Sequence, residues 1–175
     1  AWHTAPVELL DIMPEAKMNC NRTQNHKAAK VMAASMEKLA SGAKLSSKHV
    51  TNGKHSLLWK DHTTYPTLAS HSMPKNWQGK KTLSLDIYSE RPTNQIVFVA
   101  VLSDSPETKW KDFYYIPIKI NWQGTRKVEL PLSEFKKYEK AAGWDKVGGV
   151  YFFTKMFGCQ PHPYTELYLD NMKIS

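Results

Sequence analysis

Hydrophobic and polar side chains alternate with a period of two in several segments of the chain after residue 44. The alternation is clear at residues 113–120, where Ile116, Ile118 and Ile120 oppose Tyr115, Pro117 and Lys119. Strict alternation of this kind predicts strands with one face buried in a core. The predicted strands are Thr82–Tyr88, Gln95–Leu102, Phe113–Ile120, Arg126–Pro131, Gly149–Lys155 and Glu166–Ile174.

A hairpin and a helix are predicted ahead of these strands. Asn52-Gly53 separates two extended runs, Lys44–Thr51 and Lys54–Lys60, and this dipeptide favours a tight hairpin turn. The period changes to 3.6 over Gln24–Ala40, where apolar side chains recur at Ala28, Met32, Met36 and Leu39. The pattern therefore predicts an all-β antiparallel β-sandwich (jelly roll) with one N-terminal helix. We expect a single domain over residues 1–175, with an N-terminal segment at 1–43 and the sandwich at 44–175.

The tetrapeptide Asn-Trp-Gln-Gly occurs twice, at residues 76–79 and 121–124. Each copy precedes a basic pair and then a predicted strand. The repeat predicts two similar turns in which Trp77 and Trp122 cover the ends of the core. An alternative places Trp77 in an exposed aromatic and basic loop group with Lys109, Trp110 and Lys111.

The net positive charge is concentrated in a basic segment, Lys17–Lys60. This segment holds nine Lys or Arg and one acid, a surplus that equals the net charge of +8 for the whole chain. Such a segment indicates a side of the molecule that faces an anionic partner. Nucleic acid is disfavoured, because no RNP motif, zinc finger or helix-turn-helix pair is present and lysine outnumbers arginine. No apolar run is long enough to predict a membrane span.

The alternation also predicts a candidate carbohydrate-binding face. The positions opposite the buried isoleucines and leucines carry tyrosines, a phenylalanine and lysines, and a pyranose ring can stack on an aromatic ring while lysines pair with carboxylate or sulfate. To these positions we add two lysines of the basic segment and one loop tryptophan. The predicted binding residues are then Lys54, Lys60, Tyr88, Trp110, Tyr115, Lys119, Tyr151, Phe153 and Lys155. The alternative, which the pattern leaves open, is that the helix or a neighbouring domain covers this face.

Catalytic and redox signals are sparse. The sequence has no HExxH, GxSxG or P-loop motif. Tyr115, Lys119 and Tyr151 could be assembled for β-elimination on a uronic acid, but no sequence marker supports that set. The two cysteines, Cys20 and Cys159, are compatible with one disulfide or with two free thiols.

Four segments resemble a known family in their order and composition. They are Gly53–Lys60, Leu85–Pro92, Ile120–Lys127 and Leu167–Ile174. Together they resemble the N-terminal jelly-roll domain of chondroitin sulfate ABC lyases and related glycosaminoglycan lyases, a domain that is itself similar to carbohydrate-binding modules. The resemblance covers residues 44–175.

The resemblance implies a non-catalytic module that recognises an acidic polysaccharide, such as chondroitin sulfate, and accompanies a polysaccharide lyase. It implies a secreted, periplasmic or cell-surface location, and a structural Ca²⁺ held by Asp170 of the closing strand. Two alternatives stay open, namely a structural accessory domain that binds no sugar and a small jelly-roll lyase.

Overall fold

The computed structural model describes residues 2–6, 43–106 and 112–175, and in these ranges strands are the main secondary structure. The strands are β1 (Trp2–Pro6), β2 (Ala43–Ser46), β3 (Ser56–Trp59), β4 (Thr67–Ser70), β5 (Thr82–Ser89), β6 (Gln95–Leu102), β7 (Phe113–Ile120), β8 (Gly124–Pro131), β9 (Lys136–Tyr138), β10 (Gly149–Phe153) and β11 (Leu167–Ile174). One short 3₁₀ turn, η4 (Leu132–Glu134), joins β8 to β9. No helix in the described ranges is long and apolar enough to cross a membrane.

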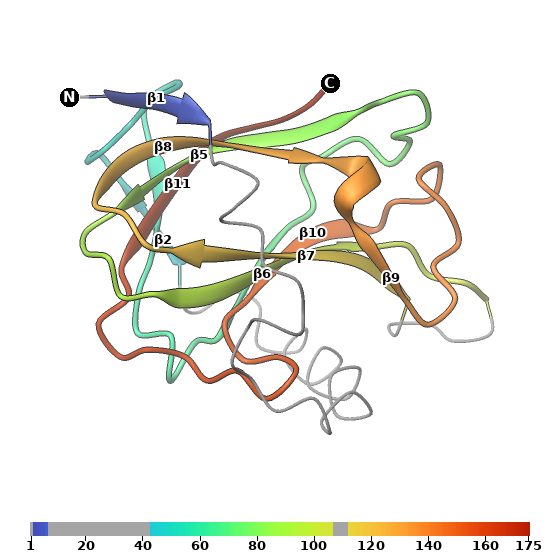
Figure 1. Cartoon of the computed structure of the whole chain (residues 1–175). Coiled ribbons are helices and arrows are strands. Elements are labelled where there is room, and N and C mark those ends of the chain that lie inside the picture. The colour runs from blue at the N-terminus through green and yellow to red at the C-terminus, as the bar shows by residue number, and fades with distance from the viewer. Residues whose placement is uncertain (1, 7–42, 107–111) are drawn as a thin grey trace.

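The strands form two sheets that face each other as the layers of a sandwich (Figure 1). One sheet has six strands in the order β1-β8-β5-β11-β3-β2, and the other has five in the order β4-β10-β6-β7-β9. All neighbouring pairs are antiparallel except β1 and β8, which are parallel. The prediction of an antiparallel β-sandwich is therefore confirmed. The predicted helix at Gln24–Ala40 lies outside the described residues.

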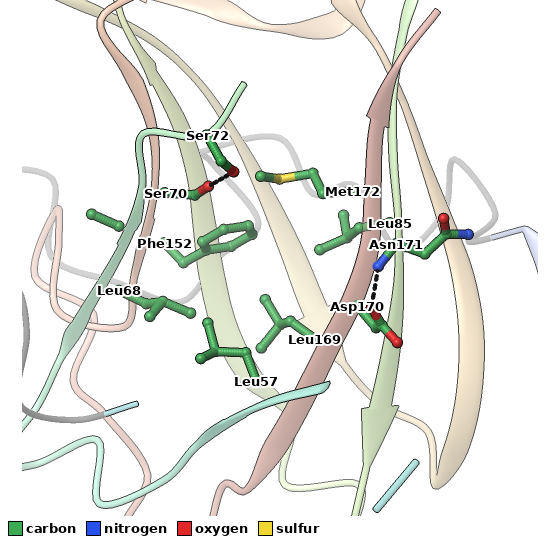
Figure 2. Close-up of a pocket in the computed structure, with 11 residues that line it drawn as sticks. Leu57, Leu68, Ser70, Ser72, Leu85, Phe152, Leu169, Asp170, Asn171 and Met172 are labelled. Carbon is green, nitrogen blue, oxygen red and sulfur yellow. Dashed lines mark hydrogen bonds between the residues drawn. The ribbon is translucent and has the colours of Figure 1, made fainter. Parts of the chain in front are cut away.

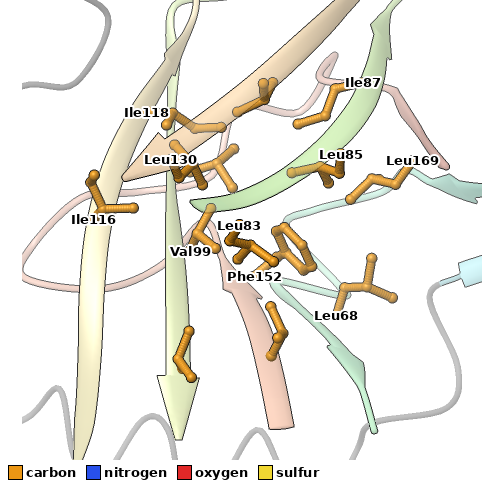
Figure 3. Close-up of a cluster of buried hydrophobic side chains, with 14 of the residues drawn as sticks. Leu68, Leu83, Leu85, Ile87, Val99, Ile116, Ile118, Leu130, Phe152 and Leu169 are labelled. Atoms are coloured by element: carbon orange, nitrogen blue, oxygen red, sulfur yellow. The ribbon is translucent and has the colours of Figure 1, made fainter. Parts of the chain in front are cut away.

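The core lies between the two sheets and consists of the side chains that the alternation assigned to it (Figure 3). Leu83, Leu85 and Ile87 of β5 contact this core from the six-stranded sheet, and Ile116 and Ile118 of β7 contact it from the other. Burial of such side chains stabilises the fold by about 25 cal/mol for each Å² of apolar surface removed from water. The inner faces thus follow the predicted pattern closely.

Both tryptophans of the repeated tetrapeptide are buried, as the first of the two interpretations predicted. Trp77 is fully buried, and its Nε1 donates to the carbonyl of Pro74. Trp122 donates from Nε1 to the carbonyl of Gly124, with the guanidinium of Arg126 over its ring. Trp77 is consequently not part of an exposed loop group.

The predicted hairpin pairs as expected, but its connection is longer than a two-residue turn. β2 and β3 are antiparallel, with Lys44 opposite Leu58. Residues 47–55 form the connecting loop, and Gly53 within it has a φ of 73° that glycine adopts without steric cost. This loop, called the 47–55 loop below, lies near the candidate site.

Candidate functional site

The structure divides the predicted binding face between two surfaces. Tyr88 and its neighbour Asp86 belong to β5 of the six-stranded sheet, whereas Tyr115 and Tyr151 belong to β7 and β10 of the five-stranded sheet. The outer faces of the two sheets point away from each other. The predicted residues therefore do not form one platform, and each outer face has to be considered separately.

The aromatic residues of the five-stranded sheet are buried. Tyr115 is 5% exposed, and Tyr151 and Phe153 are fully buried. They belong to a second apolar cluster, to which the segment after β10 contributes Met156 and Phe157. The ring of Phe157 lies 4.9 Å from that of Tyr115. The prediction that these three rings are open to a sugar is corrected here, since they are buried and the chain's own segment after β10 packs against them. The alternative named the helix or a neighbouring domain as the cover, and the predicted helix lies outside the described residues.

The remaining predicted residues on this side are less enclosed. Lys119 is half-buried on β7 and Lys155 is exposed just after β10. Cys159, in the same segment, is disulfide-bonded, while the other cysteine of the sequence, Cys20, lies outside the described residues. The predicted Trp110 also lies outside them.

Tyr151 does not fit the role of a catalytic base. Burial, with the charge of Asp104 nearby, raises the pKa of its phenol to about 12. Its hydroxyl is buried and has no hydrogen-bond partner among the described residues. A polysaccharide cannot reach this group, and the phenol stays protonated at neutral pH. The set of Tyr115, Lys119 and Tyr151 therefore gives no structural support to a lyase reaction.

The outer face of the six-stranded sheet carries a row of side chains that crosses three strands. Tyr88 of β5 is opposite Tyr168 of β11, and Tyr168 is opposite Leu58 of β3. Because directly opposite side chains lie on the same face of a sheet, the two tyrosines form an aromatic pair, and their rings are 5.8 Å apart. Lys44 of β2 is opposite Leu58 and adds an exposed cation at the end of the row.

His49 from the 47–55 loop covers this aromatic pair. Its ring stacks on Tyr88 at 3.3 Å with an interplanar angle of 8°, and meets Tyr168 edge-on at 4.7 Å. Its Nε2 lies 3.7 Å from a carboxylate oxygen of Glu90. Any ligand on this part of the sheet would therefore contact the imidazole as well as the edges of the tyrosines.

Two aspartates hold the 47–55 loop in place. Oδ2 of Asp170 accepts hydrogen bonds from the backbone N–H groups of Thr51 at 2.7 Å and Asn52 at 3.0 Å. Oδ2 of Asp86 accepts from the Thr51 hydroxyl at 2.8 Å and from Nδ2 of Asn171 at 3.1 Å. The loop is thus anchored by charge-assisted hydrogen bonds, which are stronger than those between neutral groups.

This arrangement does not fit the Ca²⁺ expected at Asp170. Calcium takes six to eight oxygen ligands, whereas the groups directed at the Asp170 carboxylate are N–H donors of Thr51, Asn52 and Asn171. The described residues also contain no group of three or more His, Cys, Asp or Glu that could hold a metal ion. A structural Ca²⁺ stays a prediction, and no role is derived for it.

Replacing Asp170 tests whether it is a loop anchor. Asp170→Ala leaves the loop N–H groups without their acceptor, and we expect the free energy of unfolding to fall by about 1–3 kcal/mol. Urea denaturation measures this loss. Glu129→Ala is the control, since Glu129 pairs with Lys127 at the surface and its loss should cost no more than about 0.5 kcal/mol. A calcium-dependent rise in Tm that Asp170→Ala abolishes would instead favour the metal site.

The described lysines of the basic segment are all exposed and all come from β2, β3 and their connections. They are Lys44, Lys48, Lys54 and Lys60. The predicted Lys54 and Lys60 thus flank β3 near the edge of the six-stranded sheet, with Lys44 and Lys48. This edge, together with the row at Tyr88, is called the hairpin face below.

A small cavity of about 200 Å³ opens between the two sheets, beside β4 and β11 (Figure 2). Core side chains such as Leu85, Phe152 and Leu169 line its interior, and Ser70 and Ser72 lie at its edge, where their hydroxyls are 3.0 Å apart. Ligand pockets usually measure about 300–1,000 Å³. The cavity is therefore too small for a polysaccharide chain, and a glycan would bind at the surface.

Comparison with known proteins places the fold. No protein-family model matches the sequence, and no curated protein is similar enough to count as a relative. Among solved structures, the family 11 carbohydrate-binding module from Clostridium thermocellum, in complex with a β-1,3-1,4-mixed-linked tetrasaccharide, is similar with a TM-score of 0.51. The match has 16% sequence identity and covers 77% of this chain and 84% of that one. The chain therefore shares its β-sandwich fold with this carbohydrate-binding module.

A second structure agrees with this assignment of the fold. The family 11 module of a cellulosomal cellulase from the same organism has a TM-score of 0.50 and 16% identity, over 77% of this chain and 83% of that one. Identity at this level establishes the architecture alone. The resemblance to a carbohydrate-binding β-sandwich is therefore supported, while the link to chondroitin lyases stays a prediction.

Sequence reasoning missed several residues that the structure brings to the surface of this sandwich. His49 gave no signal, because its contacts are with residues of β5 and β11 far along the chain. Arg91 and Tyr164 were also missed, although each lies beside a proline, and a proline next to an exposed loop residue indicates a rigid turn.

Proposed function

We propose that this protein is a non-catalytic carbohydrate-binding module for an acidic polysaccharide. The observation that carries the proposal is the exposed lysine cluster at the hairpin face of a sandwich with the fold of a carbohydrate-binding module. The lysines border an aromatic row, so a glycan crossing the strands would meet ring surfaces and cations in succession.

Each part of this surface has a separate role toward such a ligand. The imidazole of His49 and the edges of Tyr88 supply apolar contact for the faces of sugar rings. Lys44, Lys54 and Lys60 supply ammonium groups that attract carboxylates or sulfates without a fixed geometry. Contacts of this kind suit a flexible polymer, because no single cation has to be aligned with one anion.

The charge of the chain favours an acidic ligand over a neutral one. The net charge is +8, and its surplus falls within the basic segment that includes the hairpin. The resemblance of four segments to lyase-associated domains supports a glycosaminoglycan such as chondroitin sulfate, a lyase partner and a secreted, periplasmic or cell-surface location. These finer assignments are part of the proposal.

A triple substitution, Lys48→Gln, Lys54→Gln and Lys60→Gln, tests the hairpin face. Each exposed contact contributes about 0.5 kcal/mol, so we expect the three losses together to weaken binding by about tenfold. Affinity electrophoresis in gels containing chondroitin sulfate, hyaluronan, heparin or neutral glucans measures the retardation. Raising the ionic strength should weaken binding by the wild-type protein, because exposed charges are screened.

A second triple variant controls for net charge alone. Lys75→Gln, Lys80→Gln and Lys81→Gln remove the same charge from exposed positions between β4 and β5, away from the hairpin. This variant should be retarded more strongly than the hairpin variant. Retardation by neutral glucans only, by no glycan, or with no dependence on salt would contradict the proposal.

One observation favours a structural accessory domain as the second candidate. Such a domain should shield Tyr115, Tyr151 and Phe153 with protein, and all three are buried. In this chain the three rings pack in an apolar cluster with Met156 and Phe157 of the same chain, so their burial does not require a partner protein. Binding in the electrophoresis experiment separates the two functions, and incubation with uronic-acid polymers, followed by ultraviolet absorbance of unsaturated products, tests the lyase alternative.

A further inference from the structure

Tyr164, in the loop between β10 and β11, presents its ring to solvent. It is 66% exposed, and it alone is exposed among the Phe, Tyr and Trp residues of the ranges 43–106 and 112–175. The other surface aromatics are half-buried or, like Tyr88, covered by a stacked neighbour. The nearest ring is that of His162, 5.8 Å away and tilted by 57°. The exposed ring of Tyr164 thus offers an apolar surface on which a pyranose can stack.

Hydrogen bonds fix the loop that carries this ring. The backbone N–H of Tyr164 donates to Nδ1 of His162 at 3.1 Å, and its carbonyl accepts from Nη1 of Arg91 at 2.5 Å. The next residue, Thr165, is buried, and its hydroxyl lies 2.7 Å from that of Thr93 in the loop between β5 and β6. The backbone N–H of His162 is also hydrogen-bonded to Oε1 of Gln95.

This bonding pattern joins the β5–β6 and β10–β11 loops into one unit. Because the backbone beneath Tyr164 is already ordered, a ligand would immobilise little more than the tyrosine side chain. Binding to a preorganised surface avoids much of the entropy cost of association.

Arg91 places a cation at the backbone of Tyr164. Its side chain is exposed, and one of its five N–H groups donates to the carbonyl of Tyr164. That hydrogen bond holds the guanidinium at the loop and uses one of its N–H groups. Guanidinium groups bind carboxylates through paired hydrogen bonds, a geometry that a lysine does not supply.

Two glutamates, Glu90 and Glu166, make this end of the sandwich unfavourable for a ligand that carries many negative charges. Glu90 precedes Arg91, and its backbone N–H donates to the carbonyl of Glu166. Glu166 follows Thr165 in the loop that carries Tyr164, so both glutamates are near neighbours of the site along the chain. A ligand with several closely spaced sulfates would be repelled here, whereas a single carboxylate matches the single arginine.

We propose that Tyr164 and Arg91 form a binding site for one uronic acid residue, with the pyranose ring against Tyr164 and the carboxylate on Arg91. The site lies at the loop end of the sandwich and is separate from the lysines of the hairpin face. The inference rests on the proposed function, since it names a second point of contact for the same acidic polysaccharide.

Two matched ligands test the site by NMR. Methyl β-D-glucuronide and methyl β-D-glucoside differ in the carboxylate, and each is titrated into the isotope-labelled full chain. We expect the glucuronide to shift the signals of the Arg91 Nε–H group and the Tyr164 backbone amide in a saturable manner. The glucoside should bind at least about fivefold more weakly, because it lacks the charge-assisted hydrogen bonds to the guanidinium.

Variants then separate the contributions of the ring and the guanidinium. Tyr164→Ala should weaken glucuronide binding by about threefold to tenfold, whereas Tyr164→Phe should bind like the wild type because the ring remains. Arg91→Gln should weaken it by about tenfold and remove the preference over the glucoside. Leu45→Ala, at the other large apolar side chain that is exposed among the described residues, is the control and should leave glucuronide binding at Tyr164 and Arg91 unchanged.

The outcomes distinguish this inference from the proposed function. If chondroitin oligosaccharides shift the amides of the hairpin face while Arg91 and Tyr164 are silent, the inference is wrong and the proposed function stands. Equal affinity for the glucoside, or no effect of Tyr164→Ala, also overturns it. If no oligosaccharide shifts any signal, both the inference and the proposed function fail.

Discussion

Phe153→Ala is expected to lower the free energy of unfolding by about 3–5 kcal/mol, one of the two largest effects predicted for a single substitution in this chain. Phe153 is fully buried on β10, beneath the outer face of the five-stranded sheet. Its ring lies 6.2 Å from that of Tyr151, and both belong to the second apolar cluster. Removing it loses the hydrophobic contribution of the ring and leaves a cavity that the neighbouring strands can only partly fill.

Urea denaturation measures this loss, and affinity electrophoresis below the melting temperature measures glycan retention. Retention should be unchanged as long as the variant is folded, because Phe153 has no exposed surface. Tyr164→Ala is the matched control, an exposed aromatic whose loss should change stability by no more than about 0.5 kcal/mol. A Phe153→Ala variant of normal stability that no longer binds glycan would show that this face is open after all.

The buried half of the sandwich was predictable because alternation records directly which side of a strand faces the core. Leu85, Ile118 and Phe152 were assigned to the inner faces from their spacing, and all three are buried there. The bounds of β6 and β7 were also predicted to the residue, since polar or turn-forming residues flank long apolar runs. These features depend on interactions that are local in sequence.

The outer faces were not predictable in the same way. Alternation places Tyr115 and Tyr151 opposite the core, but it does not show whether another segment covers them. Here Phe157 covers Tyr115 from a turn where its φ is 52°, a conformation that no periodic pattern marks. Alternation also does not assign strands to sheets, so Tyr88 and Tyr115 were placed on one surface although they belong to different layers.

The candidate site depends on contacts between residues that are distant in the sequence. Asp170 and the backbone of Thr51 are separated by 119 residues, yet their hydrogen bond orders the loop that carries His49. Short strands such as β4, with the sequence Thr-Leu-Ala-Ser, carry too little apolar pattern to be recognised, and their pairing is set by neighbours. The lysines of the hairpin could be predicted from the sequence, because a lysine at an exposed sheet edge does not depend on contacts with residues far along the chain.

Acid is expected to destabilise the protein through His62, a residue in the turn after β3. Its imidazole is fully buried and stacks on Trp59 at 4.0 Å, with Nε2 3.1 Å from the Trp59 carbonyl. Nδ1 is buried and has no hydrogen-bond partner among the described residues. Burial lowers the pKa of His62 from 6.5 to about 4, against the smaller opposing effects of the Trp59 carbonyl and Asp61. The folded protein therefore holds this imidazole neutral.

The direction of the pH effect follows from that lowered pKa. In the unfolded chain the imidazole takes up a proton as the pH falls below 6.5, whereas in the folded protein it does so only near pH 4. The stabilising contribution is thus complete above pH 6.5 and is lost as the pH falls toward 4. The difference in pKa corresponds to a loss of about 3 kcal/mol at pH 4 relative to neutral pH.

His62→Phe isolates this contribution, because phenylalanine retains a ring against Trp59 and has no group to protonate. Urea denaturation at pH 7 and pH 4 should show that the wild type loses about 3 kcal/mol more than the variant over this interval. Carboxylates titrate in the same range in both proteins, so their effect cancels in the comparison. His55→Gln, at an exposed histidine nearby, should follow the wild type. If the wild type and His62→Phe lose the same free energy of unfolding between pH 7 and pH 4, the imidazole is protonated in the folded protein and acid acts through other groups.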